Sequence, residues 1–210
     1  MKSFIVDFWS TIFKWLRFVS LFQLIRALFP KTRGNYGFVD IWVLGNLIFS
    51  FLCLTVLSAP QVHWWEVAIL CYAGVRILEV VIYQINVLLF DEYRAKRAGI
   101  KYAVQGFRRI VLLLLHNYIE VLCWFALFYR NLASLFDSKH ISLDSLGGSL
   151  YFSLVTMSTL GYGDITPKDR AGLFLVFMQT SIGLFMALLI LARFISLIPE
   201  PETLDELEKR

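Results

Sequence analysis

Long apolar runs, separated by short charged segments, dominate the chain. A helix needs about 20 apolar residues to cross roughly 30 Å of hydrocarbon, and four runs reach that length. They cover residues 41–65, about 64–90, about 110–129 and about 171–192. The first and the fourth contain no charged residue, whereas Arg76 and Glu79 lie in the second and Glu120 lies in the third. We therefore predict an all-α membrane protein with four transmembrane helices.

A shorter amphipathic pattern precedes the first span, between Phe4 and Phe29. Polar residues recur there every three or four positions and form one narrow stripe, which consists of Ser3, Asp7, Ser10, Lys14, Arg17 and Ser20. This pattern, to which Arg26 adds a further charge, predicts one helix in the headgroup plane with its polar stripe facing water, ended by Pro30. A fifth buried helix is the alternative interpretation.

A last apolar run, Ser149–Ser158, lies between the third and fourth spans. Its ten residues are too few to cross the bilayer and too hydrophobic to be solvated. Irregular backbone at membrane depth is tolerated only where protein buries it or where it lines a watery path. We therefore predict a re-entrant segment that dips into the membrane and returns, as a pore loop does.

Composition and charge exclude several functional classes. Of the 210 residues, 58% are apolar and 17% charged, which is more apolar surface than a one-domain soluble core hides. The net charge of +4 is spread over separate segments, so nucleic-acid binding is not expected. Cys53, Cys71 and Cys123 lie in apolar runs without metal-ligand spacing, so we expect neither disulfides nor zinc.

Residues 159–164 read TLGYGD, which resembles the filter signature T-x-G-Y-G-D of the potassium channel family. A dehydrated potassium ion needs closely stacked oxygens, and a strand supplies them only if alternate residues adopt left-handed backbone conformations. Gly161 and Gly163 allow these conformations. The resemblance covers roughly residues 110–198 and implies an outer helix, a re-entrant pore helix with its filter, and an inner helix.

The resemblance also implies a role for each residue of this segment. The permeant K⁺ would be held by oxygens of Thr159, Leu160, Gly161, Tyr162 and Gly163, and no organic cofactor is expected. Asp164 would concentrate cations at the outer mouth. Tyr151 and Phe152 would join Tyr162 in an aromatic cuff around the filter. One strand per chain cannot enclose an ion, so the chain is expected to form a homotetramer.

Two features of the inner helix follow the same resemblance. Gly183 stands twenty residues beyond Gly163, at the position of the hinge glycine in simple bacterial channels; a small residue for close helix packing is the alternative. Candidates for the cavity or the gate recur at helical spacing, although a lipid-facing surface would give the same pattern; they are Leu184, Ala187, Leu188, Leu191 and Ile195.

The sequence departs from the family pattern at two positions. Leu160 stands where Val or Ile is usual, which enlarges the side chain behind the filter and bears on the strength of potassium selectivity. Val155 stands where pH-gated bacterial two-helix channels carry a buried Glu. Fast inactivation through a carboxylate pair is therefore not expected.

The intramembrane charges bear on gating. A voltage sensor needs several basic residues at three-residue intervals, and Arg76 stands alone, so strong voltage gating is not expected. Charges at membrane depth are normally paired, so we expect Arg76 to bond Glu79 or Glu120. A proton-sensing or coupling role for this cluster is the alternative.

Basic residues gather before the first span and between the second and third spans, which predicts a cytoplasmic location for both termini. The chain then divides into five segments: an interfacial helix and linker (1–37), a peripheral hairpin (38–90), a basic cytoplasmic linker (91–109), a pore domain (110–198) and an acidic cytoplasmic tail (199–210). The expected location is a plasma or inner membrane. Anionic lipids are expected partners of the basic interfacial helix.

These observations favour a potassium-selective channel without strong voltage gating. A weakly selective cation channel and a non-conducting regulatory membrane subunit are the alternatives. Enzymatic activity is not expected, because His116 with Glu120 is the one candidate pair for intramembrane catalysis and leaves the TLGYGD segment unexplained.

Overall fold

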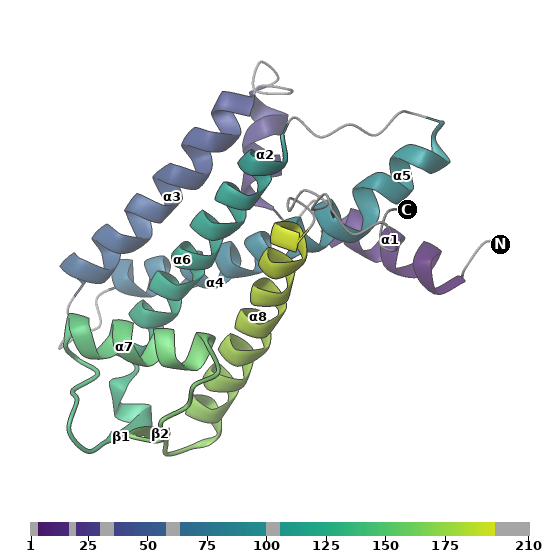
Figure 1. Ribbon diagram of the computed structural model, residues 1–210. Helices are drawn as coiled ribbons and strands as arrows, with labels where there is room; N and C mark the ends of the chain where they lie inside the picture. Colours follow the sequence, from purple (N-terminus) through teal and green to yellow (C-terminus); the bar gives the residue numbers. More distant parts are fainter. Residues whose placement is uncertain (1–3, 17–19, 30–35, 58–63, 100–105, 196–210) are drawn as a thin grey trace, which may run out of the picture.

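The computed structural model describes residues 4–16, 20–29, 36–57, 64–99 and 106–195, and these are almost wholly helical (Figure 1). The helices are α1 (Phe4–Leu16), α2 (Leu21–Leu28), α3 (Tyr36–Val56), α4 (Trp64–Ile85), α5 (Asp91–Arg97), α6 (Phe107–Asn131), α7 (Leu146–Met157) and α8 (Arg170–Ile195). The shorter elements are a π-helical turn η3 (Asn86–Phe90), a 3₁₀ turn η4 (Ala133–Leu135) and the strands β1 (Phe136–Ser138) and β2 (Ile165–Pro167). The all-α prediction is confirmed for this part of the chain, apart from one small strand pair.

Three helices in the described ranges are long and apolar enough to cross a membrane. They cover residues 37–56, 108–131 and 170–195, and correspond to the first, third and fourth predicted spans. The first prediction placed its boundaries too late, because α3 begins at Tyr36 and ends at Val56. The charge-free run continues to residue 65, beyond the end of α3.

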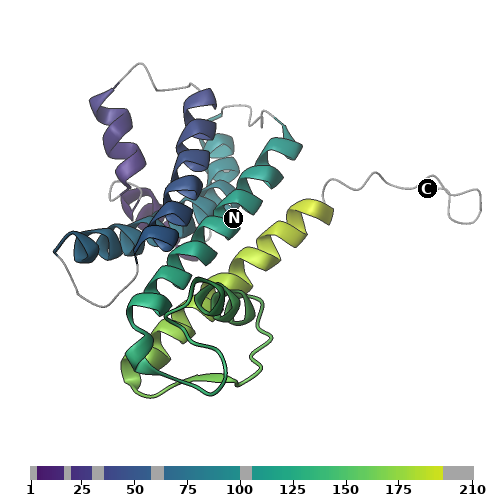
Figure 2. The same cartoon turned by 90° about the vertical axis from the view of Figure 1, so that its left-hand side faces the viewer.

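The segment predicted as the second span is not among these three helices. α4 carries Glu66, Arg76 and Glu79, and it crosses α3 and α6 obliquely (Figures 1 and 2). After α4 the chain stays helical through η3 and α5 as far as Arg97. The boundary predicted between residues 90 and 91 coincides with the change from η3 to α5, and both the fourth span and its end at residue 90 remain predictions.

The N-terminal segment forms two helices instead of the one predicted. Ser20 caps α2, because its side chain accepts a hydrogen bond from the backbone N–H of Gln23 at 3.3 Å. The sequence periodicity places Ser20 in a continuous polar stripe. Serine is also a common N-cap residue, and Ser20 has that role here. Arg17 and Pro30, on which that prediction also relied, lie outside the described residues, as does the tail at 199–210.

Asp7 and Ser10 of the polar stripe of α1 face protein, whereas Lys14 is exposed. Asp7 accepts hydrogen bonds from Tyr93, at 2.7 Å, and from Arg97 of α5. Asn86 of η3 donates to the carbonyl of Phe13 at 3.2 Å, so the polar side of α1 docks on the η3–α5 arm. The apolar side is the exposed one, with Phe4, Ile5, Phe8, Trp9 and Trp15. Alternation of polar and apolar residues predicted the two faces but not which of them meets protein.

α6 is the central helix and contacts α3, α4, α7 and α8. The core includes an aromatic group at the C-terminal end of α6, where the Tyr129 ring lies 4.6 Å from Phe152 and 5.3 Å from Phe136 between centroids. β1 and β2 pair in antiparallel register beside this group, with Phe136 opposite Pro167. The strand pair ties the chain after α6 to the chain before α8, and α7 lies in the loop between them.

Candidate functional site

α7 is a short buried helix that ends immediately before the TLGYGD segment. Ser145 caps it by accepting a hydrogen bond from the N–H of Gly148 at 3.0 Å. A Cβ at Gly148 would collide with the carbonyl of Ser142, so the entry turn requires glycine there. Twelve residues give a helix of about 18 Å, which is too short to cross a bilayer.

Hydrogen bonds fix α7 between the two long helices beside it. The Ser153 hydroxyl donates to the carbonyl of Leu122 on α6 at 2.7 Å. Gln179 of α8 donates to the Ser153 hydroxyl at 2.7 Å and to the Ser153 carbonyl at 3.0 Å. Both side chains are fully buried. Sequence reasoning missed this network, although a lone Gln in an otherwise apolar span was the available signal.

The backbone alternates in handedness along residues 159–163. Thr159, Gly161 and Gly163 have φ values of +61°, +56° and +75°, and Leu160 and Tyr162 between them do not have positive φ. The two glycines thus adopt the left-handed conformation predicted for them. Thr159 was not predicted to do so, and a β-branched residue pays about 1–3 kcal/mol for this conformation. Alternation of this kind is the geometry in which successive carbonyls can turn to one side.

The side chains of this segment are exposed in the single chain. Leu160 is 60% and Tyr162 68% exposed, although both are large and apolar or aromatic. The candidate cavity residues on α8 are exposed as well: Leu184, Ala187, Leu188, Leu191 and Ile195. They alternate along α8 with buried positions such as Gly183 and Met186. One side of α8 and the TLGYGD segment therefore present apolar surface that the chain itself does not cover.

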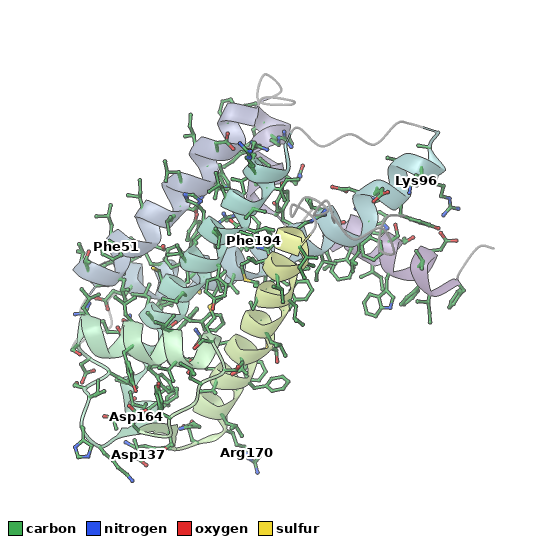
Figure 3. The ribbon with its side chains drawn as sticks, in the orientation of Figure 1. Phe51, Lys96, Asp137, Asp164, Arg170 and Phe194 are labelled. Carbon is green, nitrogen blue, oxygen red and sulfur yellow. The ribbon has the colours of Figure 1, made fainter. Side chains whose placement is uncertain are left out.

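Asp164 is held in place at the end of this segment. Tyr151 donates a hydrogen bond to Asp164 Oδ2 at 2.8 Å, and the N–H of Ile165 donates to Oδ1 at 3.2 Å. The hydrogen bond to Asp164 raises the pKa of Tyr151, so the phenol stays protonated and remains the donor. Figure 3 shows Asp164 at the same end of the molecule as Asp137 and Arg170, whereas Phe194 lies at the other end of α8.

Phe152 does not share the position predicted for it beside Tyr162. Its ring is buried and packs against Tyr129 and Phe136 on the α6 side of α7. Adjacent residues on a helix point about 100° apart, so Tyr151 can reach Asp164 only when Phe152 faces elsewhere. The prediction that Tyr151 and Phe152 both belong to a cuff around the filter is therefore wrong for Phe152.

Gly183 lies where α8 passes the C-terminal end of α7. A Cβ there would come within 2.5 Å of the Met157 carbonyl oxygen and 2.8 Å of Met157 Cγ. α8 runs unbroken from Arg170 to Ile195 through this position. Close packing, one of the two predicted roles of Gly183, accounts for a glycine here.

A charged cluster lies on the opposite side of α6. Arg76 bonds both predicted carboxylates: its Nε and Nη2 donate to the two oxygens of Glu120 at 2.7 and 3.0 Å, and its Nη1 donates to Glu79 at 2.7 Å. Trp124 also donates to Glu120, at 3.1 Å. The three ionisable side chains are at most 5% exposed.

Two carboxylates face one guanidinium in this cluster, and α2 offsets the surplus negative charge. The second oxygen of Glu79 accepts hydrogen bonds from the backbone N–H of Phe22, at 2.7 Å, and from the Ser20 hydroxyl. These groups form the N-terminus of α2, where the helix dipole presents partial positive charge. Glu79 therefore links α2 to Arg76 and, through Arg76, to α6. Sequence reasoning missed this contact, because Ser20 is 59 residues from Glu79.

The predicted catalytic alternative is not assembled. His116 Nδ1 lies 2.6 Å from the carbonyl of Leu112 in its own helix, whereas Glu120 is fully buried in the charged cluster. Among the described residues, no group of three or more His, Cys, Asp or Glu side chains is placed to hold a metal ion. All three cysteines have free thiols, with Cys53 and Cys123 buried and Cys71 exposed.

Part of the chain matches a known protein family. Residues 118–200, which run from the middle of α6 to beyond α8, match the family model described as an ion channel. The comparisons with curated proteins and with solved structures gave no match.

Proposed function

We propose that the ion channel domain at residues 118–200 conducts K⁺ through a filter that four copies of this chain form together. The observation that carries the proposal is the alternating backbone of Thr159, Gly161 and Gly163, placed directly after a short buried helix. Carbonyl oxygens that face one side at close spacing can replace the hydration shell of a potassium ion. Thr159, Leu160, Gly161, Tyr162 and Gly163 are the proposed ligands.

The exposed surfaces support a tetramer. One strand offers an ion oxygens on one side only, and a cyclic assembly of four supplies the rest. Tyr162 and Leu160 then pack behind the filter and against neighbouring subunits, which accounts for large apolar side chains exposed in the single chain. The exposed side of α8, from Leu184 to Ile195, then lines the cavity and could close it by dewetting.

Electrostatics supports a cation as the permeant species. The C-terminal end of α7 carries partial negative charge and adjoins Thr159, so it points toward the site where the ion would enter the filter. Asp164, repeated four times, would concentrate cations at the other end. Its hydrogen bonds with Tyr151 and Ile165 hold the carboxylate beside the filter strand.

The charged cluster supports a channel without strong voltage gating. Arg76 is the one basic residue of α4, and each elementary charge that crosses the field contributes about 2.3 kcal/mol per 100 mV. Its bonds to Glu79 and Glu120 hold it in place in the protein interior. A structural role for the cluster agrees with these contacts.

The test is the reversal potential of the purified protein in planar bilayers, with K⁺ on one side and Na⁺ on the other. The expected value lies near the potassium equilibrium potential. Gly161→Ala should abolish K⁺-selective current, because the φ of +56° costs a side-chain-bearing residue about 1–2 kcal/mol in each of four subunits. Gly45→Ala is the matched control, since nothing lies within 4 Å of the added methyl group.

Two other outcomes would support the alternatives. A reversal potential near zero would indicate a weakly selective cation channel, which the larger Leu160 side chain would explain. No current from a protein that native mass spectrometry shows to be a tetramer, under any applied voltage and pH, would favour a non-conducting membrane subunit.

A further inference from the structure

A second pocket lies away from the filter, between α4, η3, α6 and α8. Its lining residues come from all four of these elements. Most of its walls are apolar, formed by Val87, Ile110, Leu113, Leu114 and Leu189. Of its lining residues, Leu189 and Arg193 lie in the stretch that matches the ion channel family, and the others precede that stretch.

Two arginines line the pocket from different helices. Arg109 belongs to the first turn of α6 and Arg193 to the last turn of α8, so both mark the same end of the bundle. The charges around them are mixed: Arg109 pairs with Asp40 at 2.6 Å, and the charge of Arg193 acts on Glu92. Glu92 is itself paired with Lys96 at 2.7 Å, so a second cation already offsets it.

Unpartnered amide groups lie deeper in the same pocket. Gln84 is 2% exposed, and neither its Nε2 nor its Oε1 has a hydrogen-bond partner. The Oδ1 atom of Asn117, which is 3% exposed, has none either. Asn117 is eight residues beyond Arg109, or about 12 Å along α6. A buried polar atom without a partner is destabilising, so an occupant with polar groups at this depth would be stabilised.

We propose that this pocket binds an anionic phospholipid. The phosphate fits between the guanidinium groups of Arg109 and Arg193, which can form charge-assisted hydrogen bonds to its oxygens. The ester region of the lipid reaches the depth of Gln84, whose amide N–H₂ can donate to an ester carbonyl. The first part of an acyl chain lies along the leucines. The proposal requires that the chain sits in a membrane and does not depend on which ion it conducts.

The bound lipid would join two parts of the proposed channel. Arg193 lies two residues before Ile195, the last of the candidate gate residues on α8. Val87 belongs to the η3–α5 arm on which α1 docks, and Gln84 belongs to the last turn of α4, directly before that arm. A phospholipid between them would therefore hold the end of α8 against the peripheral helices.

Native mass spectrometry of the full-length protein in detergent tests the proposal. Phosphatidylglycerol should bind saturably, and phosphatidylcholine should bind at least ten-fold more weakly. Arg193→Gln and Arg109→Gln should each lower the affinity for phosphatidylglycerol five-fold or more. The matched control is Arg108→Gln, because Arg108 is an exposed neighbour that does not line the pocket, and its affinity should stay within two-fold.

Conservative variants separate lost binding from lost folding. Arg109→Lys and Arg193→Lys keep the charge and should retain most of the binding. Arg109→Gln also loses the pair with Asp40, so the Arg193→Gln variant decides the result if Arg109→Gln unfolds.

Four results would overturn the proposal. An equal loss in Arg108→Gln would mean general charge attraction, and equal binding of phosphatidylcholine would mean a site for any lipid. Displacement by millimolar inorganic phosphate alone would mean a site for free phosphate. Binding that appears only after removal of residues 199–210 would mean that the acidic tail occupies the pocket.

Discussion

Two buried polar networks meet α6 at neighbouring positions and differ in kind. On the side of α7 and α8, Ser153 and Gln179 form a neutral network that ends on the carbonyl of Leu122. On the side of α4, Glu120 belongs to a charged network with Arg76. A neutral hydrogen bond in a membrane protein is worth about 0.6 kcal/mol on average, whereas a buried charge without its partner costs several kcal/mol. Several weak hydrogen bonds thus hold α7 against α6 and α8. The contact of α4 with α6 depends instead on one strongly stabilising ion-pair cluster.

The largest expected effect is the loss of Arg76. Arg76→Leu would leave Glu79 and Glu120 buried without a counter-ion, and breaking such a pair costs about 3–5 kcal/mol. We expect a large drop in the thermal unfolding temperature and a low yield of folded protein. Unfolding followed by circular dichroism in detergent measures this.

A triple variant sharpens that result. Arg76→Leu together with Glu79→Leu and Glu120→Leu removes all three charges, so it should recover a large part of the lost stability. Recovery would show that unpaired charge is the cause. If Arg76→Leu alone were as stable as the unmodified protein, the charged network would not contribute more to stability than the neutral one. That result would contradict the contrast drawn between the two networks.

The next largest effect is expected where α8 passes the end of α7. Close packing, rather than charge, determines the stability of this contact. Gly183→Ala would place a methyl group 2.5 Å from the Met157 carbonyl oxygen, and overpacking of this kind costs about 1–3 kcal/mol. We expect a lower unfolding temperature and a displaced end of α7. Gly74→Ala is the control, because its nearest contact would be an ordinary 3.9 Å. A variant that keeps full stability but opens less often in bilayer recordings would instead support the hinge interpretation of Gly183.

The same contrast explains what the sequence could predict. The TLGYGD segment is a local feature: its resemblance to the T-x-G-Y-G-D signature predicted left-handed backbone at Gly161 and Gly163 and implied a short helix before it. Thr159 continues the same two-residue alternation of left-handed residues. It was not predicted, because the left-handed conformation was assigned to glycines alone. The three long apolar helices could likewise be predicted from consecutive residues alone.

The remaining features depend on contacts between distant residues. Ser20 and Glu79 are 59 positions apart, so no pattern along the chain could indicate that Glu79 caps α2. The periodicity of polar residues predicted that α1 is amphipathic. It could not predict that Asp7 contacts α5 instead of water, because this depends on tertiary packing. Phe152 was misplaced for a related reason: nearly every position of α7 is apolar, and such a helix does not indicate which side faces α6.

The smallest expected effect is the loss of the neutral network. Ser153→Ala removes the donor to the Leu122 carbonyl and one acceptor of Gln179, while the second bond of Gln179, to the Ser153 carbonyl, can remain. Hydrogen bonds between membrane helices are worth about 0.6–1.7 kcal/mol, so the loss of stability should be several-fold smaller than for Arg76→Leu. Ser158→Ala is the control, because the Ser158 hydroxyl donates only within α7, to Leu154 and Val155. Unfolding in detergent should rank the variants Arg76→Leu, Gly183→Ala, Ser153→Ala. If Ser153→Ala lowered the stability as much as Arg76→Leu, the position of α7 would depend on this single hydroxyl. The idea that several weak interactions hold α7 would then be wrong.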